Sequence, residues 1–188
     1  MNIAVFASGN GSNFEAIVQA GAEVKLLVCD KPGAYALERA ESHGIQSFVF
    51  QPKDFSSKAD YEQQIIEKLN ECGIELIVLA GYMRLIGPVL LKAYEGRIIN
   101  IHPSLLPAFP GLDAIGQAMD AGVKVSGVTV HFVDEGMDTG PIIAQEPVKI
   151  EDGDTLDDVT KKIQQVEHQL YPATVQRVIE DLKRGVQR

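Results

Sequence analysis

The sequence predicts an α/β protein: a single, mostly parallel, twisted sheet with helices on both faces. Short apolar runs that suit strands alternate with stretches of helical periodicity, which is typical of βαβ units with right-handed crossovers. A Gly-rich turn at residues 8–13 joins the first expected strand to the first helix. Residues 74–80 are apolar throughout, as expected of a central parallel strand that is buried on both faces.

The expected elements are justified by these patterns in chain order. Four apolar runs predict strands at residues 2–7, 24–29, 46–50 and 74–80. Helical periodicity and start signals predict helices at residues 14–20, capped by Ser12 or Asn13, then at 34–43, at 58–71, and from Pro88 onward.

In the second half of the chain, a short strand ends near His102 and a helix covers residues 112–121. β-branched runs at residues 125–133 and 142–150 flank an acidic loop and predict an antiparallel addition to the sheet. An apolar stripe from Leu156 to Leu170 predicts a helix capped by Asp154 or Thr155. After Pro172 we expect a polar helix and a frayed tail.

Length and composition predict one domain, residues 1–188, without a surface suited to polyanionic partners. A chain of 188 residues, 45% hydrophobic, suffices for one core and is short for two domains. The net charge of −9, without a basic run longer than two residues, disfavours nucleic acid or acidic membranes as partners. No apolar stretch reaches the roughly 18 residues that span a bilayer, and no signal peptide is apparent. We expect a cytoplasmic protein, either a monomer or a homodimer.

The stretch from Arg97 to Gly111 holds the candidate reacting groups. Asn100 and His102 are two apart on the expected strand, so their side chains share one face. Pro103 ends the strand, which places the pair at its carboxyl end, where open α/β sheets bind ligands. The Asn100 amide can donate to a developing oxyanion, and His102 can exchange protons near neutral pH. Asn and a His before Pro also occur as plain turn residues.

The Gly-rich turn at residues 8–13 is a candidate phosphate site. Gly9 and Gly11 permit positive φ and close backbone approach, and the helix that follows aims its first N–H groups at an anion. A dinucleotide site is the alternative, because Asp30 ends the next strand at the distance of a ribose-binding acid. The third Gly of that fingerprint is missing, since Phe14 stands there. Such turns also occur without any ligand.

Two strings of the sequence closely resemble the signature of the folate-dependent formyltransferases. They are Ser8-Gly9-Asn10-Gly11-Ser12-Asn13 and Asn100-Ile101-His102-Pro103-Ser104-Leu105-Leu106-Pro107, the latter followed by Phe109-Pro110-Gly111. The resemblance runs in register from residue 1 to about Pro172. It implies a Rossmann-like formyltransferase fold and an enzyme of purine synthesis. The implied reaction moves a formyl group from 10-formyltetrahydrofolate, the co-substrate, to the amine of glycinamide ribonucleotide, without a metal, giving formylglycinamide ribonucleotide and tetrahydrofolate.

The resemblance also implies which residues form the site. The catalytic group is Asn100, His102 and Asp138, with Asp138 held between Gly136 and Gly140 to orient His102. The residues implied for the ribonucleotide are Gly11, Ser12, Asn13, Gln164 and Glu167. Those implied for the folate are Lys58, Met83, Arg84, Leu85, Ile86 and Asn100, and the apolar loop at residues 81–87 also suits a flat heteroaromatic ring on its own composition.

Two histidine positions qualify this assignment. Many relatives carry a His two residues after the Pro-Gly pair, whereas this chain has Asp113. His131 alternates within its expected strand, and we interpret it as structural.

Three other functions stay open. Formyl transfer to methionyl-tRNA belongs to the same family, but those enzymes usually add a basic C-terminal domain, which this acidic chain lacks. Formyltetrahydrofolate hydrolases use water as the acceptor and usually carry an N-terminal regulatory domain, whereas here the catalytic pattern starts at Met1. A non-catalytic mononucleotide-binding module is the third, and in that case Asn100, His102 and Asp138 need not converge.

Overall fold

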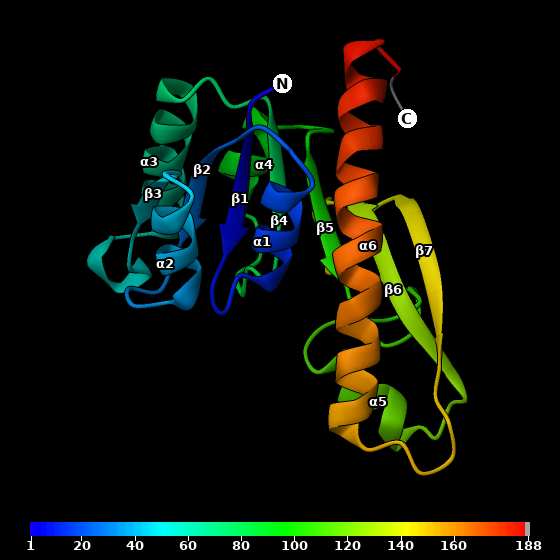
Figure 1. Cartoon of the computed structure of the whole chain (residues 1–188). Coiled ribbons are helices and arrows are strands. Elements are labelled where there is room, and N and C mark those ends of the chain that lie inside the picture. The colour runs from blue at the N-terminus through cyan, green and yellow to red at the C-terminus, as the bar shows by residue number, and fades with distance from the viewer. Residues whose placement is uncertain (187–188) are drawn as a thin grey trace.

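The computed structural model describes residues 1–186, which form a seven-stranded sheet flanked by helices (Figure 1). The strand order is β3-β2-β1-β4-β5-β6-β7. The first five strands of this order are parallel, whereas β6 pairs antiparallel with β5 and β7 pairs antiparallel with β6. The strands are β1 (Ile3–Ala7), β2 (Val24–Cys29), β3 (Gln46–Val49), β4 (Leu76–Leu79), β5 (Ile98–His102), β6 (Val125–Phe132) and β7 (Ile142–Lys149).

Helices cover both faces of the sheet. Successive side chains of a strand point to opposite faces, and β1 is buried at every position, so each face needs helices that cover it. On one face, Val5 of β1 joins a core cluster with Phe14 and Ile17 of the first helix. On the other face, Phe6 joins a cluster with Ile65 of the third helix. The helices are α1 (Ser12–Gln19), α2 (Tyr35–Ser42), α3 (Lys58–Glu71), α4 (Pro88–Ala93), α5 (Ala114–Asp120) and α6 (Leu156–Lys183), with a 3₁₀ turn at Pro52–Asp54.

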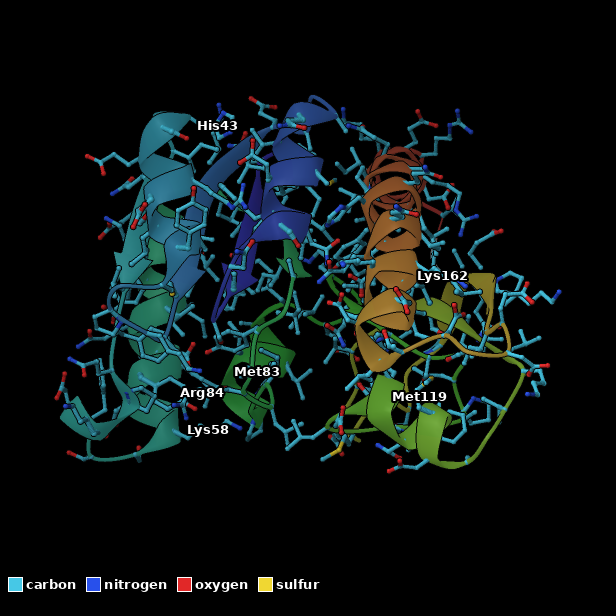
Figure 2. All side chains as sticks on the ribbon, turned by 60° about the horizontal axis from the view of Figure 1, so that its bottom comes forward. His43, Lys58, Met83, Arg84, Met119 and Lys162 are labelled. Atoms are coloured by element: carbon cyan, nitrogen blue, oxygen red, sulfur yellow. The ribbon has the colours of Figure 1, made fainter. Side chains whose placement is uncertain are left out.

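The strand order reverses next to β1, which defines where a ligand is expected. From β1 the chain runs outward to β2 and β3, then returns to β4 on the other side of β1 and continues to β5. In sheets of this kind, the crevice outside the carboxyl ends of the strands at the reversal binds ligands. Figure 2 turns this edge toward the viewer and shows Met83 and Arg84 on it.

Helix α6 is fixed across the centre of the sheet by a buried tyrosine. The Tyr171 hydroxyl is fully buried and donates to the backbone carbonyl of Leu79 on β4 at 2.7 Å, with the carbonyl of Ile99 on β5 at 3.3 Å. Glu167 precedes Tyr171 by one helical turn, so this anchor also sets the position of the Glu167 carboxyl group.

The fold class predicted from sequence is confirmed, including the antiparallel addition formed by β6 and β7. The expectation for the cap of α1 is wrong: the N-cap is Gly11, in the left-handed conformation, and not Ser12 or Asn13. At α6, by contrast, Thr155 is the cap, in a reciprocal capping box with Asp158.

The expectation for the C-terminal region is also wrong. One helix, α6, runs continuously through Pro172 rather than giving way to a polar helix. Val175, Val178 and Ile179 are buried after the proline, so the apolar stripe continues to dock on the sheet. The expected frayed tail falls largely on residues 187–188, outside the described residues. None of the helices within residues 1–186 is long and apolar enough to cross a membrane.

Candidate active site

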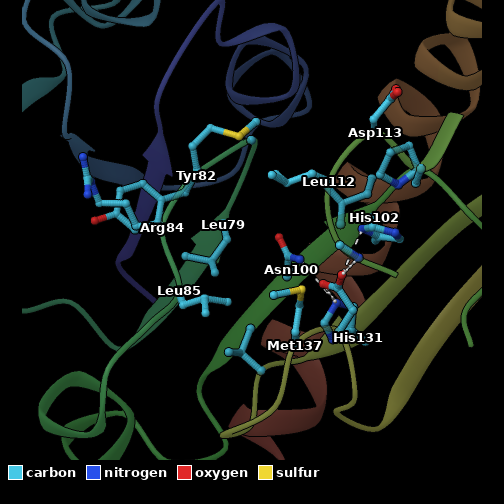
Figure 3. Close-up of a pocket in the computed structure, with 18 of the residues that line it drawn as sticks. Leu79, Tyr82, Arg84, Leu85, Asn100, His102, Leu112, Asp113, His131 and Met137 are labelled. Atoms are coloured by element: carbon cyan, nitrogen blue, oxygen red, sulfur yellow. Dashed lines mark hydrogen bonds and ion pairs between the residues drawn. The ribbon is translucent and has the colours of Figure 1, made fainter. Parts of the chain in front are cut away.

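A cleft of about 620 Å³ opens where the carboxyl ends of β4 and β5 meet the loop after β6 (Figure 3). Its volume lies within the range of roughly 300 to 1,000 Å³ found for small-molecule sites. The cleft also takes residues from α1, from the segment before α5 and from α6. Nine of the predicted site residues line it: Asn13, Met83, Arg84, Leu85, Ile86, Asn100, His102, Asp138 and Glu167.

His102 is held between a backbone carbonyl and a carboxylate. Its Nε2 lies 2.8 Å from the carbonyl oxygen of Phe109, so the Nε2–H donates there and fixes the ring. Nδ1 then faces Oδ2 of Asp138 at 3.5 Å, an ion-pair distance longer than a direct hydrogen bond. The His102 side chain is buried but lines the cleft, and Nδ1 is therefore the ring nitrogen available to a substrate.

Asp138 is presented by an irregular backbone. Its φ of 56° lies in the left-handed region, which Asp tolerates better than most residues. Oδ2 also accepts the Gly111 N–H at 2.8 Å, which ties the loop after β6 to the proline-rich loop after β5. The carboxylate is therefore aimed at His102 by two loops that are distant in sequence.

His131, interpreted from sequence as structural, lines the cleft as well. Its Nδ1 lies 2.8 Å from the Phe132 carbonyl oxygen, and its Nε2 lies 3.3 Å from Nδ2 of Asn100 and 3.7 Å from Oδ1 of Asp138. Burial lowers the pKa of His131, which favours a neutral ring. A neutral ring that donates through Nδ1 must accept through Nε2, so it takes one N–H of the Asn100 amide and leaves the second N–H for a ligand.

Helices α1 and α6 contribute Asn13 and Glu167 to the cleft. Nδ2 of Asn13 donates to Oε2 of Glu167 at 3.2 Å, and burial raises the pKa of the Glu167 carboxyl group. Oδ1 of Asn13 is buried and has no hydrogen-bond partner among residues 1–186. A buried acceptor without a partner is costly, so this atom is a candidate contact for a ligand donor.

Gly11 and Ser12 begin helix α1 but do not line the cleft themselves. Gly11 has a φ of 76°, and a Cβ there would lie 2.7 Å from the Cβ of Ala36, so only Gly fits. No side chain caps α1, and its first N–H groups have no acceptor within the helix. Lys58 and Gln164 are exposed and lie outside the cleft.

The loop between β4 and α4 forms the apolar wall of the cleft. The side chains of Met83 and Leu85 are 62% and 58% exposed, which leaves apolar surface free for a ligand. Arg84 turns away from the Asn100 group in Figure 3, and its Nε donates to Oδ2 of Asp30 at 2.6 Å. The other oxygen of Asp30 accepts the Ser8 hydroxyl at 2.5 Å. Both carboxylate oxygens are engaged, which argues against Asp30 as a ribose-binding acid.

The arrangement suits a reaction in which a carbonyl carbon becomes tetrahedral. An amide donor, an imidazole nitrogen and a carboxylate face one cleft, which is what oxyanion stabilisation and proton transfer require. No cluster of three or more His, Cys, Asp or Glu side chains that could hold a metal occurs in the described part of the chain.

Comparisons with known proteins identify the family of the chain. Residues 1–175 match the model of the formyl transferase family. The chain is 59% identical to the phosphoribosylglycinamide formyltransferase of Bacillus subtilis, over 97% of this chain and 96% of that protein. It is 39% identical to the Escherichia coli enzyme of the same name, over 93% and 85%. The crystal structure of phosphoribosylglycinamide formyltransferase from Bacillus halodurans superposes with a TM-score of 0.93 at 58% identity, covering 95% of each chain. The chain therefore belongs to the formyl transferase family, in the branch of the phosphoribosylglycinamide formyltransferases.

Proposed function

We propose that this chain transfers the formyl group of 10-formyltetrahydrofolate to the primary amine of glycinamide ribonucleotide, with Asn100, His102 and Asp138 at the reacting centre. The observation that carries the proposal is the convergence of these three side chains on one cleft, with Asp138 3.5 Å from His102 and His131 3.3 Å from Asn100. A non-catalytic nucleotide-binding module has no need for this convergence.

The proposed chemistry is addition of the amine followed by loss of tetrahydrofolate. The amine nitrogen forms a bond to the formyl carbon, and the formyl oxygen gains negative charge in the tetrahedral intermediate. The free N–H of Asn100 and the Nδ1–H of a protonated His102 stabilise that oxygen. The bond from the formyl carbon to N10 then breaks, N10 gains a proton and the amine loses one. Asp138 lies 3.5 Å from Nδ1 of His102, where its negative charge stabilises positive charge that develops on the imidazole during proton transfer.

The two substrates are assigned to opposite sides of the reacting centre. The apolar wall with Met83, Leu85 and Ile86 suits the flat pterin ring, with backbone groups as its polar partners. The first N–H groups of α1, from Gly11 to Asn13, suit the ribonucleotide phosphate, and the Glu167 carboxyl suits its ribose hydroxyls. Contact by Gly11, Ser12, Lys58 or Gln164 requires a ligand that extends beyond the cleft, because none of these four residues lines it.

We further propose that the partners of this protein are small molecules in the cytoplasm. The net charge of −9 opposes binding to nucleic acid, including a tRNA acceptor. A hydrolase that uses water in place of the amine is distinguished from a transferase by the need for the acceptor.

The test is formyl transfer by the purified protein, followed as tetrahydrofolate release by absorbance. We expect release only when glycinamide ribonucleotide is added, and release with 10-formyltetrahydrofolate alone would instead indicate hydrolysis. Replacing His102 by Ala should lower turnover by about 100- to 10,000-fold, the usual range for a general acid–base group. His43→Ala, which changes an exposed histidine at the end of α2, is the matched control. Turnover of His102→Ala within a few-fold of the parent would remove His102 from the mechanism.

A further inference from the structure

A buried carboxylate outside the reacting centre has both of its oxygens bound. Asp30 follows β2, and its side chain is only 1% exposed. Oδ2 accepts the Nε–H of Arg84 at 2.6 Å, and Oδ1 accepts the hydroxyl of Ser8 at 2.5 Å. Burying a carboxylate is costly unless it is paired and hydrogen-bonded, and these two contacts offset that cost.

Ser8 connects Asp30 to the loop that forms the wall of the cleft. Its Oγ accepts the backbone N–H of Met83 at 2.9 Å, and its own backbone N–H donates to the Gly81 carbonyl at 3.2 Å. A serine hydroxyl carries one proton, and that proton is committed to Asp30. The lone pairs of Oγ are consequently left to face Met83, so Asp30 sets the direction in which Ser8 accepts.

The wall is held by polar contacts in addition to the apolar packing of Tyr82 and Ile86 on the core. Its side chains Met83 and Leu85 are more than half exposed and contribute little to holding the loop. At the far end of the loop, buried Glu62 accepts the N–H of Gly87 at 2.5 Å and that of Leu90 at 3.2 Å, which fixes the start of α4. Between these two ends, Tyr82 and Ile86 pack on the core, and the polar contacts of Met83 and Arg84 lead to Ser8 and Asp30.

We propose that Asp30 is a positioning residue for the folate side of the cleft: through Ser8 it fixes the Met83 backbone, and through Nε it fixes the Arg84 side chain. The inference rests on the proposed function, because it assigns this wall to 10-formyltetrahydrofolate. An ordered wall lets the pterin bind without first ordering the loop, and loop ordering is a cost that lowers affinity. Asp30 touches neither substrate, and it acts only through these two neighbours.

The test compares Asp30→Asn and Ser8→Ala with the parent in steady-state formyl transfer, each substrate being varied in turn. Asp30→Asn replaces one carboxylate oxygen by an NH2 group, so Ser8 and Arg84 can no longer each donate to an oxygen of their own. Ser8→Ala removes the acceptor of the Met83 N–H and the hydroxyl that donates to Asp30, but it leaves Asp30 paired with Arg84. For both variants we expect KM for 10-formyltetrahydrofolate to rise about 10-fold or more, the usual range for losing a hydrogen bond to a charged group. KM for the ribonucleotide and kcat should stay within about threefold.

Asp152→Asn is the matched control, because Asp152 also pairs with a cation, Lys124 at 2.7 Å, but is exposed and outside the cleft. It should leave both KM values unchanged. A merely structural role of Asp30 would change both KM values, or would lower kcat in proportion to the folded fraction seen by circular dichroism. Either result overturns the proposal, as does a folate KM within twofold of the parent in both variants.

The test remains informative if a variant does not fold or if the parent shows no formyl transfer. If Asp30→Asn does not fold, Ser8→Ala decides alone, since it removes one oxygen atom and leaves the contact between Asp30 and Arg84. If the parent shows no formyl transfer, the proposed function fails, and calorimetric titration of 10-formyltetrahydrofolate into the parent and into Ser8→Ala still tests the positioning role.

Discussion

The contact between Asp138 and His102 supports a quantitative prediction for the Asp138→Asn variant. We expect kcat to fall by about 100-fold or more while KM for the ribonucleotide stays within about threefold. The amide retains an oxygen that can accept the Gly111 N–H, now made to Oδ2 at 2.8 Å, and Asn tolerates the φ of 56° as Asp does. The substitution therefore removes the negative charge and leaves the loop geometry in place.

The magnitude follows from the 3.5 Å between Nδ1 and Oδ2. A unit charge pair at that distance attracts by about 1 kcal/mol in bulk water and about 5 kcal/mol at the effective dielectric constant near 20 that suits protein sites. Since each 1.36 kcal/mol is tenfold in rate, these limits correspond to losses of about 5-fold and a few thousand-fold. The side chains are 7% and 13% exposed, so the loss should lie in the upper part of this range.

The assay is tetrahydrofolate release at saturating folate with the ribonucleotide varied, combined with calorimetric titration of the ribonucleotide. Asp120→Asn is the control, because that carboxylate is exposed at the end of α5 and does not line the cleft. A variant Asp138→Asn with nearly full turnover and greatly weakened ribonucleotide binding would refute the reasoning, because the carboxylate would then serve binding and not charge stabilisation.

Three further predictions concern the rest of the site. His131→Leu should lower kcat about 10-fold because Asn100 loses the acceptor that orients its amide, and His131→Gln, which can place an oxygen near the Nε2 position, should recover most of that loss in the same assay. Gly11→Ala should lower the unfolding free energy by about 2 to 5 kcal/mol, because alanine is strained at φ 76° and its Cβ would lie 2.7 Å from the Cβ of Ala36. Urea titration measures this change, and an unchanged midpoint would contradict the prediction. Glu167→Gln should raise Tm more at pH 8 than at pH 5, because burial raises the pKa of Glu167 and its ionisation destabilises the fold as pH rises through that pKa; an equal effect at both pH values would refute this.

Much of the fold could be predicted because local signals and tertiary packing agree. The predicted strand at residues 24–29 and the predicted helix at residues 58–71 coincide with β2 and α3. In α3 the Ser57 side chain accepts from the Asp60 N–H, a capping contact within the local sequence that favours a helix start at Lys58. In α1 the cap is decided by a contact that local sequence does not reveal, since Gly11 packs against Ala36 of α2.

Pro172 illustrates the opposite conflict, in which tertiary packing overrides a local signal. A proline inside a helix removes one hydrogen bond and disfavours the helical state by about 3 kcal/mol. The flanking residues Tyr171 and Val175 are fully buried against the sheet, and the Tyr171 hydroxyl binds two strand carbonyls. Packing on both sides of the proline stabilises the continuous helix, and this cannot be read from the local pattern.

The contacts of Asp30 cannot be predicted from the sequence for a different reason. Its partners Ser8 and Arg84 lie 22 and 54 residues away in sequence. They meet because β1, β2 and β4 are consecutive in the sheet and parallel, so that their carboxyl ends share one edge. Sequence alone predicts the three strands but not their order, and the pattern of a ribose-binding acid was the only signal that Asp30 carried.

His131, in contrast, had a usable signal in the alternation of two strands. In β5, Ile99 and Ile101 alternate with Asn100 and His102; in β6, Val128 and Val130 alternate with Thr129 and His131. When such strands pair antiparallel, apolar positions share one face and polar positions the other, and the observed register sets His131 opposite Asn100 and Thr129 opposite His102. A shift of β5 by one residue against β6 would turn Ile99 and Ile101 toward the cleft and would turn Asn100 and His102 toward the core. The packing of the apolar face against α6 therefore enforces the observed register. The hydrophobic core on one side of the sheet thereby fixes the alignment of the amide and the imidazoles on the other.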